Sequence, residues 1–179
     1  MALILPQERL EELRRRLQAS GRRPSMLFAT TSPAVLEAIQ LVEEFGPMCE
    51  ALYLVMVADG RLLNVEREVL RGALDVLSAG RIRTAHMESM LDNAARRIAE
   101  HGAEALLNNV IGALEEDPAR AEATVVLAIA VAAADGSIVP EEQLVIDKLA
   151  AGLDLGSMRG TELLEQIVSG LDTRKNPDR

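Results

Sequence analysis

The chain has 179 residues, a formal net charge of −9 at pH 7, one cysteine, two Phe, one Tyr and no Trp. The length fits one domain with at most a short appendage, and the scarcity of aromatic residues favours close helix packing over a β-sandwich. The negative charge argues against nucleic-acid binding, which depends on Lys and Arg. The single cysteine excludes an intrachain disulfide and fits a cytoplasmic protein.

Residues 1–31 are predicted to form an amphipathic helix and a linker. The helix, Pro6–Ala19, carries leucines on one face and arginines on the other, and Gly21–Pro24 ends it. Charged residues and Pro6 interrupt the apolar start of the chain, so we expect no signal peptide. The basic cluster has two interpretations, a solvated face or a contact with an acidic partner or lipid headgroups.

Residues 32–171 are predicted to form one all-α domain, which with the first helix makes about eight or nine helices, followed by a polar tail at residues 172–179. One helix begins at Ser32-Pro33 and is expected to stop at Gly46-Pro47. The others are Met48–Ala58, Val65–Leu77, Thr84–His101, Ala103–Glu116, Ala119–Ala134, Pro140–Leu153 and Thr161–Leu171. The longest apolar run, Ala123–Ala134, is too short to span a bilayer, which needs about 20 residues. It is predicted to be a buried helix.

One stretch of the chain occurs twice. Val57–Glu66 returns as Ala133–Glu142, and one offset of 76 residues aligns Asp59-Gly60 with Asp135-Gly136 and Glu66 with Glu142. Each copy places an apolar helix before Ala-Asp-Gly and an acidic residue at the start of the next helix. We interpret this as an internal duplication of a helical unit, with repeat halves at about residues 48–80 and 119–153.

The two loops are candidate cation sites. In each copy the Asp follows a helix and the Glu lies in the first turn of the next helix, so the loop would bring two carboxylates together. Ca²⁺ and Mg²⁺ bind such oxygen clusters, whereas a Zn²⁺ site would need Cys and His. Neither loop has the EF-hand pattern. The alternative is purely structural, because Asp-Gly is ordinary turn chemistry and Glu is favoured at a helix start.

Two Ala-Asp-Gly-x-hydrophobic-x-x-x-Glu loops in an all-helical chain resemble the TerB-like family of tellurite-resistance proteins, over roughly Ser32–Leu171. The resemblance implies a cytoplasmic helical domain, associated with the bacterial membrane face, stress responses and protein complexes, whose acidic loops bind a divalent metal. The metal candidates that it implies are Asp59, Glu66, Asp135 and Glu142, with Glu141 as an accessory ligand. The first copy has Val65 where the second has Glu141, so the two sites are not expected to bind equally.

Catalysis is not expected. Neither His86 nor His101 has the Glu three residues earlier that a di-iron bundle requires, and no phosphate loop or Gly-x-Ser-x-Gly elbow occurs. Cys49 is expected to be a small buried apolar residue. The alternative to a metal-binding stress protein is a metal-independent scaffold or adaptor, which would bind a protein partner through the Met87/Met90 helix or the basic first helix.

Overall fold

A computed structural model of the chain describes residues 11, 14–15 and 33–155, and within them it contains only helices, turns and loops. Six α-helices and one 3₁₀ helix are present in this part of the chain. They are α2 (Pro33–Met56), α3 (Asn64–Ser78), α4 (Thr84–His101), α5 (Ala103–Leu114), α6 (Pro118–Ala132), η1 (Ala133–Asp135) and α7 (Pro140–Gly152). The predicted all-α class is confirmed. Most of the predicted Pro6–Ala19 helix, all of Thr161–Leu171 and the tail lie outside the described residues.

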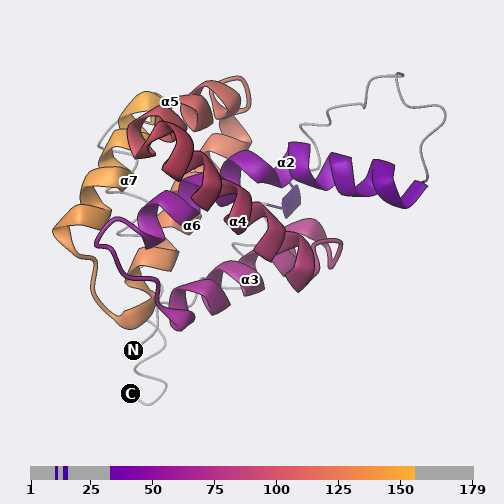
Figure 1. Cartoon of the computed structure of the whole chain (residues 1–179), viewed down its shortest axis with the longest axis horizontal. Coiled ribbons are helices and arrows are strands. Elements are labelled where there is room, and N and C mark those ends of the chain that lie inside the picture. The colour runs from indigo at the N-terminus through magenta and orange to yellow at the C-terminus, as the bar shows by residue number, and fades with distance from the viewer. Residues whose placement is uncertain (1–10, 12–13, 16–32, 156–179) are drawn as a thin grey trace, which may run out of the picture.

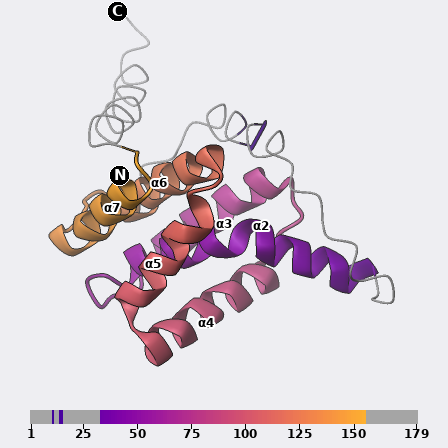
Figure 2. The ribbon, with the colours of Figure 1, turned by 90° about the horizontal axis from the view of Figure 1, so that it is seen from above.

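Helices α2 and α6 form the centre of the bundle (Figures 1 and 2). Helix α2 packs against α4, α5, α6 and α7, while α6 also contacts α3, α5 and α7. Every residue of α6 from Arg120 to Ala132 is buried, which confirms the expected core position of the apolar run. A helix with no polar face must be covered on all sides, so the other helices are arranged around it.

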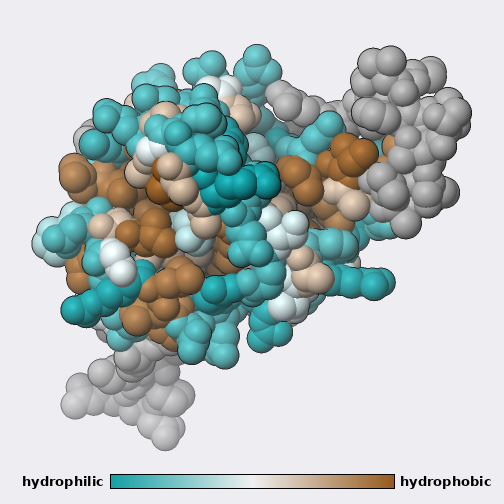
Figure 3. Space-filling view, viewed as in Figure 1, coloured by the Kyte–Doolittle hydropathy of each residue, from teal (hydrophilic) through white to brown (hydrophobic). Residues whose placement is uncertain are grey.

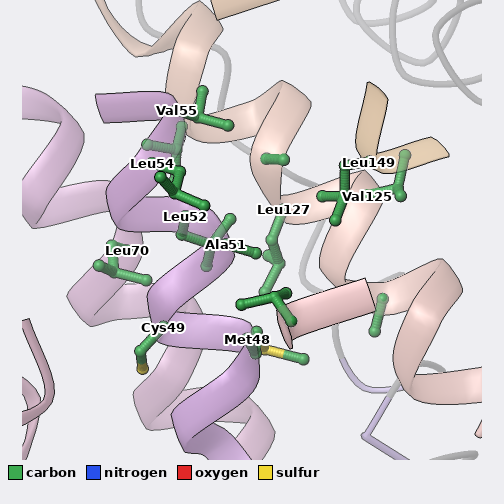
Figure 4. Packing of buried hydrophobic residues seen from close by; sticks show 14 of the residues in the cluster. Met48, Cys49, Ala51, Leu52, Leu54, Val55, Leu70, Val125, Leu127 and Leu149 are labelled. Carbon is green, nitrogen blue, oxygen red and sulfur yellow. The ribbon is translucent and has the colours of Figure 1, made fainter. Parts of the chain in front are cut away.

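The contact between the two central helices consists of aliphatic side chains and alanines. Figure 4 shows Ala51 and Leu52 of α2 directed toward Leu127 of α6, and all three are at most 1% exposed. Alanines of α6 such as Ala128 and Ala130 have no exposed surface at all, because small side chains allow neighbouring helices to approach closely. Cys49 lies in the same core and is fully buried, as expected from the sequence.

The predicted break at Gly46-Pro47 is wrong, because α2 runs through both residues without interruption. An interior proline removes one helix hydrogen bond and costs about 3 kcal/mol. The apolar side chains on both sides of Pro47 are buried, with Phe45 at 1% and Met48 at 0% exposure. Burial of such side chains contributes about 1.5–3 kcal/mol each, so tertiary packing outweighs the local preference to stop.

The described surface is mainly hydrophilic, with separate apolar areas, as Figure 3 shows for one face. The large apolar side chains that remain exposed are Val42, Leu62 and Leu144. Among the described residues, no helix combines the length and the apolar character that crossing a bilayer requires.

Candidate functional site

The first acidic loop follows the end of α2 at Met56. The Asp59 carboxylate turns back onto its own loop and accepts a hydrogen bond from the Arg61 backbone N–H at 2.8 Å. The N–H of Gly60 donates to the Val57 carbonyl at 3.0 Å, and Gly60 has a φ of +77°. This backbone conformation favours glycine, since it has no Cβ to clash. Asp-Gly therefore forms a tight turn between α2 and α3.

The second loop repeats this turn in detail. The Asp135 carboxylate accepts a hydrogen bond from the Ser137 N–H at 3.0 Å and from the Ser137 hydroxyl at 3.3 Å. The N–H of Gly136 donates to the Ala133 carbonyl at 3.0 Å, and Gly136 has a φ of +103°. Both loops then continue through an extended residue, Leu63 or Val139, into the next helix.

A buried glutamate stands in the first turn of each of these helices. Glu66 in α3 is 3% exposed and Glu142 in α7 is 4% exposed. The Glu142 Oε2 atom accepts a hydrogen bond from the Val139 N–H at 3.0 Å, so this side chain closes the helix start as in a capping box. The sequence predicted the position of both glutamates beside the loops, but it gave no sign that they are buried.

The two loops lie at the same end of the bundle. Both views place the α2–α3 loop beside the start of α7 (Figures 1 and 2), and α3 packs against η1. The pKa of Glu66 is raised to about 7, first by burial and then by the negative charges of Glu142, Asp59 and Asp135, while a hydrogen bond from the Leu63 backbone acts to lower it. The structure therefore brings the four predicted loop carboxylates into one electrostatic cluster.

Glu142 shares this environment. Its pKa is raised by burial and, more weakly, by Asp59, Asp135 and the neighbouring Glu141, while the Val139 hydrogen bond lowers it. Glu141 itself is exposed. The four carboxylates are not close enough to form a metal site as they stand. In the described part of the chain, no three Asp, Glu, His or Cys side chains are grouped so that they could hold one ion.

The Oε2 atom of Glu66 stands out in this cluster. It is buried and has no hydrogen-bond partner, a condition that it shares among described side chains only with Nε of Arg120. Burying a carboxylate oxygen without a partner is costly, and here neighbouring negative charges add to the cost. Arg61 is a cation near this cluster, with its Nε atom 4.0 Å from Oδ2 of Asp59, and it leaves Oε2 of Glu66 without a partner.

The other residues singled out in the sequence have different surroundings. Met87 and Met90 are 2% and 4% exposed and belong to the core, so they offer little surface to a partner. His101 is exposed, and the His86 Nδ1 atom lies 3.4 Å from the Arg83 backbone N–H. Burial raises the pKa of the Cys49 thiol to about 12, which keeps it protonated and unreactive at neutral pH.

One buried ionic group was missed in the sequence. Glu50 of α2 is 7% exposed, and both of its carboxylate oxygens accept hydrogen bonds from the Arg97 Nη1 atom of α4, at 2.5 and 2.6 Å. The available signal was that Glu50 is the one charged residue in the apolar stretch 48–58. Its partner lies 47 positions away, which no local pattern reveals.

Comparison with known protein families gives a match that covers the acidic loops. The model of the family described as "Tellurite resistance protein TerB" matches residues 47–160, which is more than half of the chain and includes both acidic loops. No curated protein and no solved structure shows a significant match.

Proposed function

The chain belongs to the tellurite resistance protein TerB family, and we propose that it is a non-enzymatic protein of the bacterial response to tellurite, metal or general stress. In this proposal its two acidic loops bind one divalent cation between them. The observation that supports cation binding is the state of the Glu66 carboxylate. One of its oxygens is buried without a partner, and the negative charges of three further carboxylates raise its pKa. A bound cation would add positive charge beside Glu66 and favour the ionised form of these carboxylates.

The donor atoms suit a hard cation. Hydrogen bonds occupy Oε2 of Glu142 and Oδ1 of Asp135, which leaves the second oxygen of each carboxylate for a ligand, together with Oε2 of Glu66. An all-oxygen set fits Ca²⁺ or Mg²⁺ better than Zn²⁺. Because no three such groups are already assembled in the described part of the chain, binding must draw the two loops closer together. Water would complete the coordination.

The proposed effect of the cation is mechanical. Asp59 follows α2 and Glu66 opens α3, while Asp135 ends η1 and Glu142 opens α7. A cation held by both loops would fix how α3 and α7 leave the central helices. It would thereby set the surface that this end of the bundle presents to a protein partner in the cytoplasm. The partner would recognise the cation-bound arrangement.

The matching loops also support our inference of an internal duplication. The Asx-type turn, the glycine with positive φ and the buried glutamate recur at the same relative positions. The second half of α2 and the whole of α6 are the corresponding buried helices. A duplicated unit that packs against its own copy would place its two loops at one end, where four carboxylates could serve one cation.

A metal-independent adaptor is the second proposal. It is favoured by the hydrogen bonds that already give each loop aspartate a structural role, and by the absence of an assembled three-ligand group among the described residues. In this version Glu66 is a buried acid that is tolerated at neutral pH because it takes up a proton. The two proposals differ in whether a cation changes the protein at all.

Calorimetric titration of metal-free protein with Ca²⁺, Mg²⁺ and Zn²⁺ tests the first proposal. We expect one Ca²⁺ or Mg²⁺ per chain with a Kd of roughly 10⁻⁵ M or below, within the range of protein calcium sites. Asp59→Ala combined with Asp135→Ala should abolish the binding. The matched control combines Glu37→Ala with Asp75→Ala, which changes the net charge equally at two exposed positions away from the loops.

Stoichiometry separates a shared site from two separate ones. If one cation bridges the loops, either Asp59→Ala or Asp135→Ala alone should weaken the whole binding signal. Two cations per chain, with each single variant removing one of them, would contradict the bridging geometry. Heat at the noise level for every cation, with the double variant folded as judged by circular dichroism, would overturn the cation proposal and leave the adaptor.

A further inference from the structure

A cavity of about 590 Å³ lies between α2 and α4, away from the acidic loops. Its walls are formed by residues 42–50 of α2 and residues 89–97 of α4. These stretches lie in the middle of both helices, whereas the acidic loops begin after Met56. The volume falls within the range of about 300–1,000 Å³ that is typical of small-molecule sites.

Two residues of α2 keep this cavity open. Gly46 has no side chain, and a Cβ built on it would meet only the Val42 Cγ1 atom, at 3.7 Å. Pro47 has no N–H, so the carbonyl of Glu43 lacks the donor that a helix normally supplies four residues later. The residues that were expected to end the helix therefore leave space beside Gly46 and one helix carbonyl without its usual donor.

A hydrogen-bonded chain of side chains crosses the cavity wall. Arg97 of α4 neutralises the buried Glu50 of α2, and the Asn93 Nδ2 atom donates to Glu50 Oε1 at 3.4 Å. The Asn93 Oδ1 atom in turn accepts a hydrogen bond from Arg96 Nη2 at 2.7 Å. Asn93 thus holds one edge of the Arg96 guanidinium, while the remaining N–H groups of that guanidinium are available to a ligand.

Three charges on the wall have no ion-pair partner within the described residues. They are the carboxylates of Glu43 and Asp92 and the guanidinium of Arg96. Val42 and Pro47 add apolar surface to the same cavity, and Val42 is 53% exposed. All three charged residues are exposed and so reach solvent at the mouth of the cavity. Charges of both signs beside apolar surface would suit a ligand that itself carries both charges.

We propose that this cavity binds a small zwitterion with an apolar body, of which a free aliphatic amino acid is the simplest example. Arg96 pairs with the ligand carboxylate through its guanidinium fork, which suits the planar geometry of a carboxylate. Glu43 and Asp92 receive the ligand ammonium group, and the Glu43 carbonyl is a further acceptor. Val42 and Pro47 contact the aliphatic side chain. The proposal does not depend on a cation at the acidic loops.

The test uses three probes of similar shape on metal-free full-length protein in EDTA. They are L-leucine, 3-methylbutylamine, which lacks the carboxylate, and 4-methylpentanoate, which lacks the ammonium group. Binding is followed by amide shifts in ¹⁵N–¹H spectra up to about 10 mM ligand, which detects millimolar affinity. We expect leucine to bind roughly tenfold more tightly than either single-charge probe, because each of these probes lacks one of the two charge-assisted contacts.

Variants assign the roles of the charges. Arg96→Gln should reduce leucine affinity roughly tenfold and leave the affinity for the amine probe unchanged. Glu43→Gln combined with Asp92→Asn should also reduce leucine affinity roughly tenfold, but leave the affinity for the carboxylate probe unchanged. Arg71→Gln is the matched control, since Arg71 is exposed on α3. Gly46→Leu should abolish binding by filling the cavity while keeping the helix, because Leu is a better helix former than Gly.

Several outcomes would overturn the proposal. They are no amide shifts at residues 42–50 and 89–97 with L-leucine, equal affinity for leucine and the amine, or unchanged leucine affinity in Arg96→Gln. None of these results bears on the loop cation, because EDTA is present throughout and the loop carboxylates are unaltered. Conversely, absence of cation binding at the loops would leave this cavity proposal intact.

Discussion

The two acidic loops have the same backbone conformation, but their glutamates have different charged surroundings. Both form an Asp-Gly turn with the same hydrogen bonds, and both lead to a buried glutamate. In the second loop Glu142 uses Oε2 to accept the Val139 N–H, and the exposed Glu141 adds one more negative charge. In the first loop Val65 replaces that acid, and Oε2 of Glu66 is left buried without a partner.

The difference shows which parts of a repeated motif are structural. The turn and the helix start are the same in both copies, so they satisfy the needs of the backbone in each. The environment of the glutamates is not fixed by the turn, since it depends on how the two copies pack against each other. The buried Oε2 atom of Glu66, which has no partner, is therefore a feature of the packing between the copies and not of the turn.

The largest effect that we expect from the difference between the loops is on the pH dependence of stability. The folded-state pKa of Glu66 is raised from 4.5 to about 7, so its stabilising contribution is fully present below pH 4.5 and is lost as the pH rises through 7. A shift of this size corresponds to at most about 3 kcal/mol. We expect metal-free wild type to lose up to that much between pH 5 and 8, relative to Glu66→Gln.

Chemical denaturation of both proteins in EDTA at several pH values measures this difference. Glu142→Gln is the companion variant, because the pKa of Glu142 is raised by burial and neighbouring carboxylates as well, and both glutamates accept a backbone hydrogen bond from the residue three positions earlier. We expect it to show a pH-dependent gain of the same sign. Parallel stability curves for wild type and Glu66→Gln would mean that Glu66 is not a strained acid and would remove the distinction between the loops.

Much of the local structure could be predicted from the sequence. The helix Thr84–His101 was predicted with both of its ends as observed, because its apolar spacing and the following Gly102 are local signals. The predicted helix end at Gly46-Pro47 is wrong, since packing against helices distant in the sequence carries α2 through Pro47. Local sequence preferences determine where a helix begins and ends only where tertiary packing does not oppose them.

The site shows the same division. The four loop carboxylates could be named from the repeated spacing, but their convergence depends on how the two copies pack. The burial of Glu66 and the pairing of Glu50 with Arg97 across 47 positions likewise follow from contacts between distant helices. A sequence lists the groups that carry chemistry, whereas their pKa values arise only from the folded arrangement.

A second test compares the two turns themselves. Gly60→Ala and Gly136→Ala each place a Cβ on a residue with positive φ, which costs roughly 1–2 kcal/mol. Nothing lies within 4 Å of the Cβ position at Gly60, so its cost is purely conformational. We expect the two variants to lose stability equally, to within about 0.5 kcal/mol, as measured by urea denaturation.

Gly72→Ala is the control for these two variants. Gly72 lies inside α3 and also has open space at its Cβ position, but its conformation is helical. The alanine should therefore raise stability by about 0.5–1 kcal/mol. If Gly136→Ala proved much more damaging than Gly60→Ala, the two turns would not be equivalent, and the case for a duplicated unit would weaken.

The smallest expected effect comes from exchanging the residues that distinguish the loops. Val65→Glu gives the first loop the extra acid of the second, and Glu141→Val removes it from the second. In metal-free protein at low salt, Val65→Glu should lower stability and Glu141→Val should raise it, each by at most about 0.5 kcal/mol. Salt at about 1 M should suppress both changes by screening.

With saturating Ca²⁺ the signs of both stability changes should reverse, because a further carboxylate then strengthens the site. Denaturation curves with and without Ca²⁺ measure this reversal, and signs that stay the same in Ca²⁺ would place the bound ion away from residues 65 and 141.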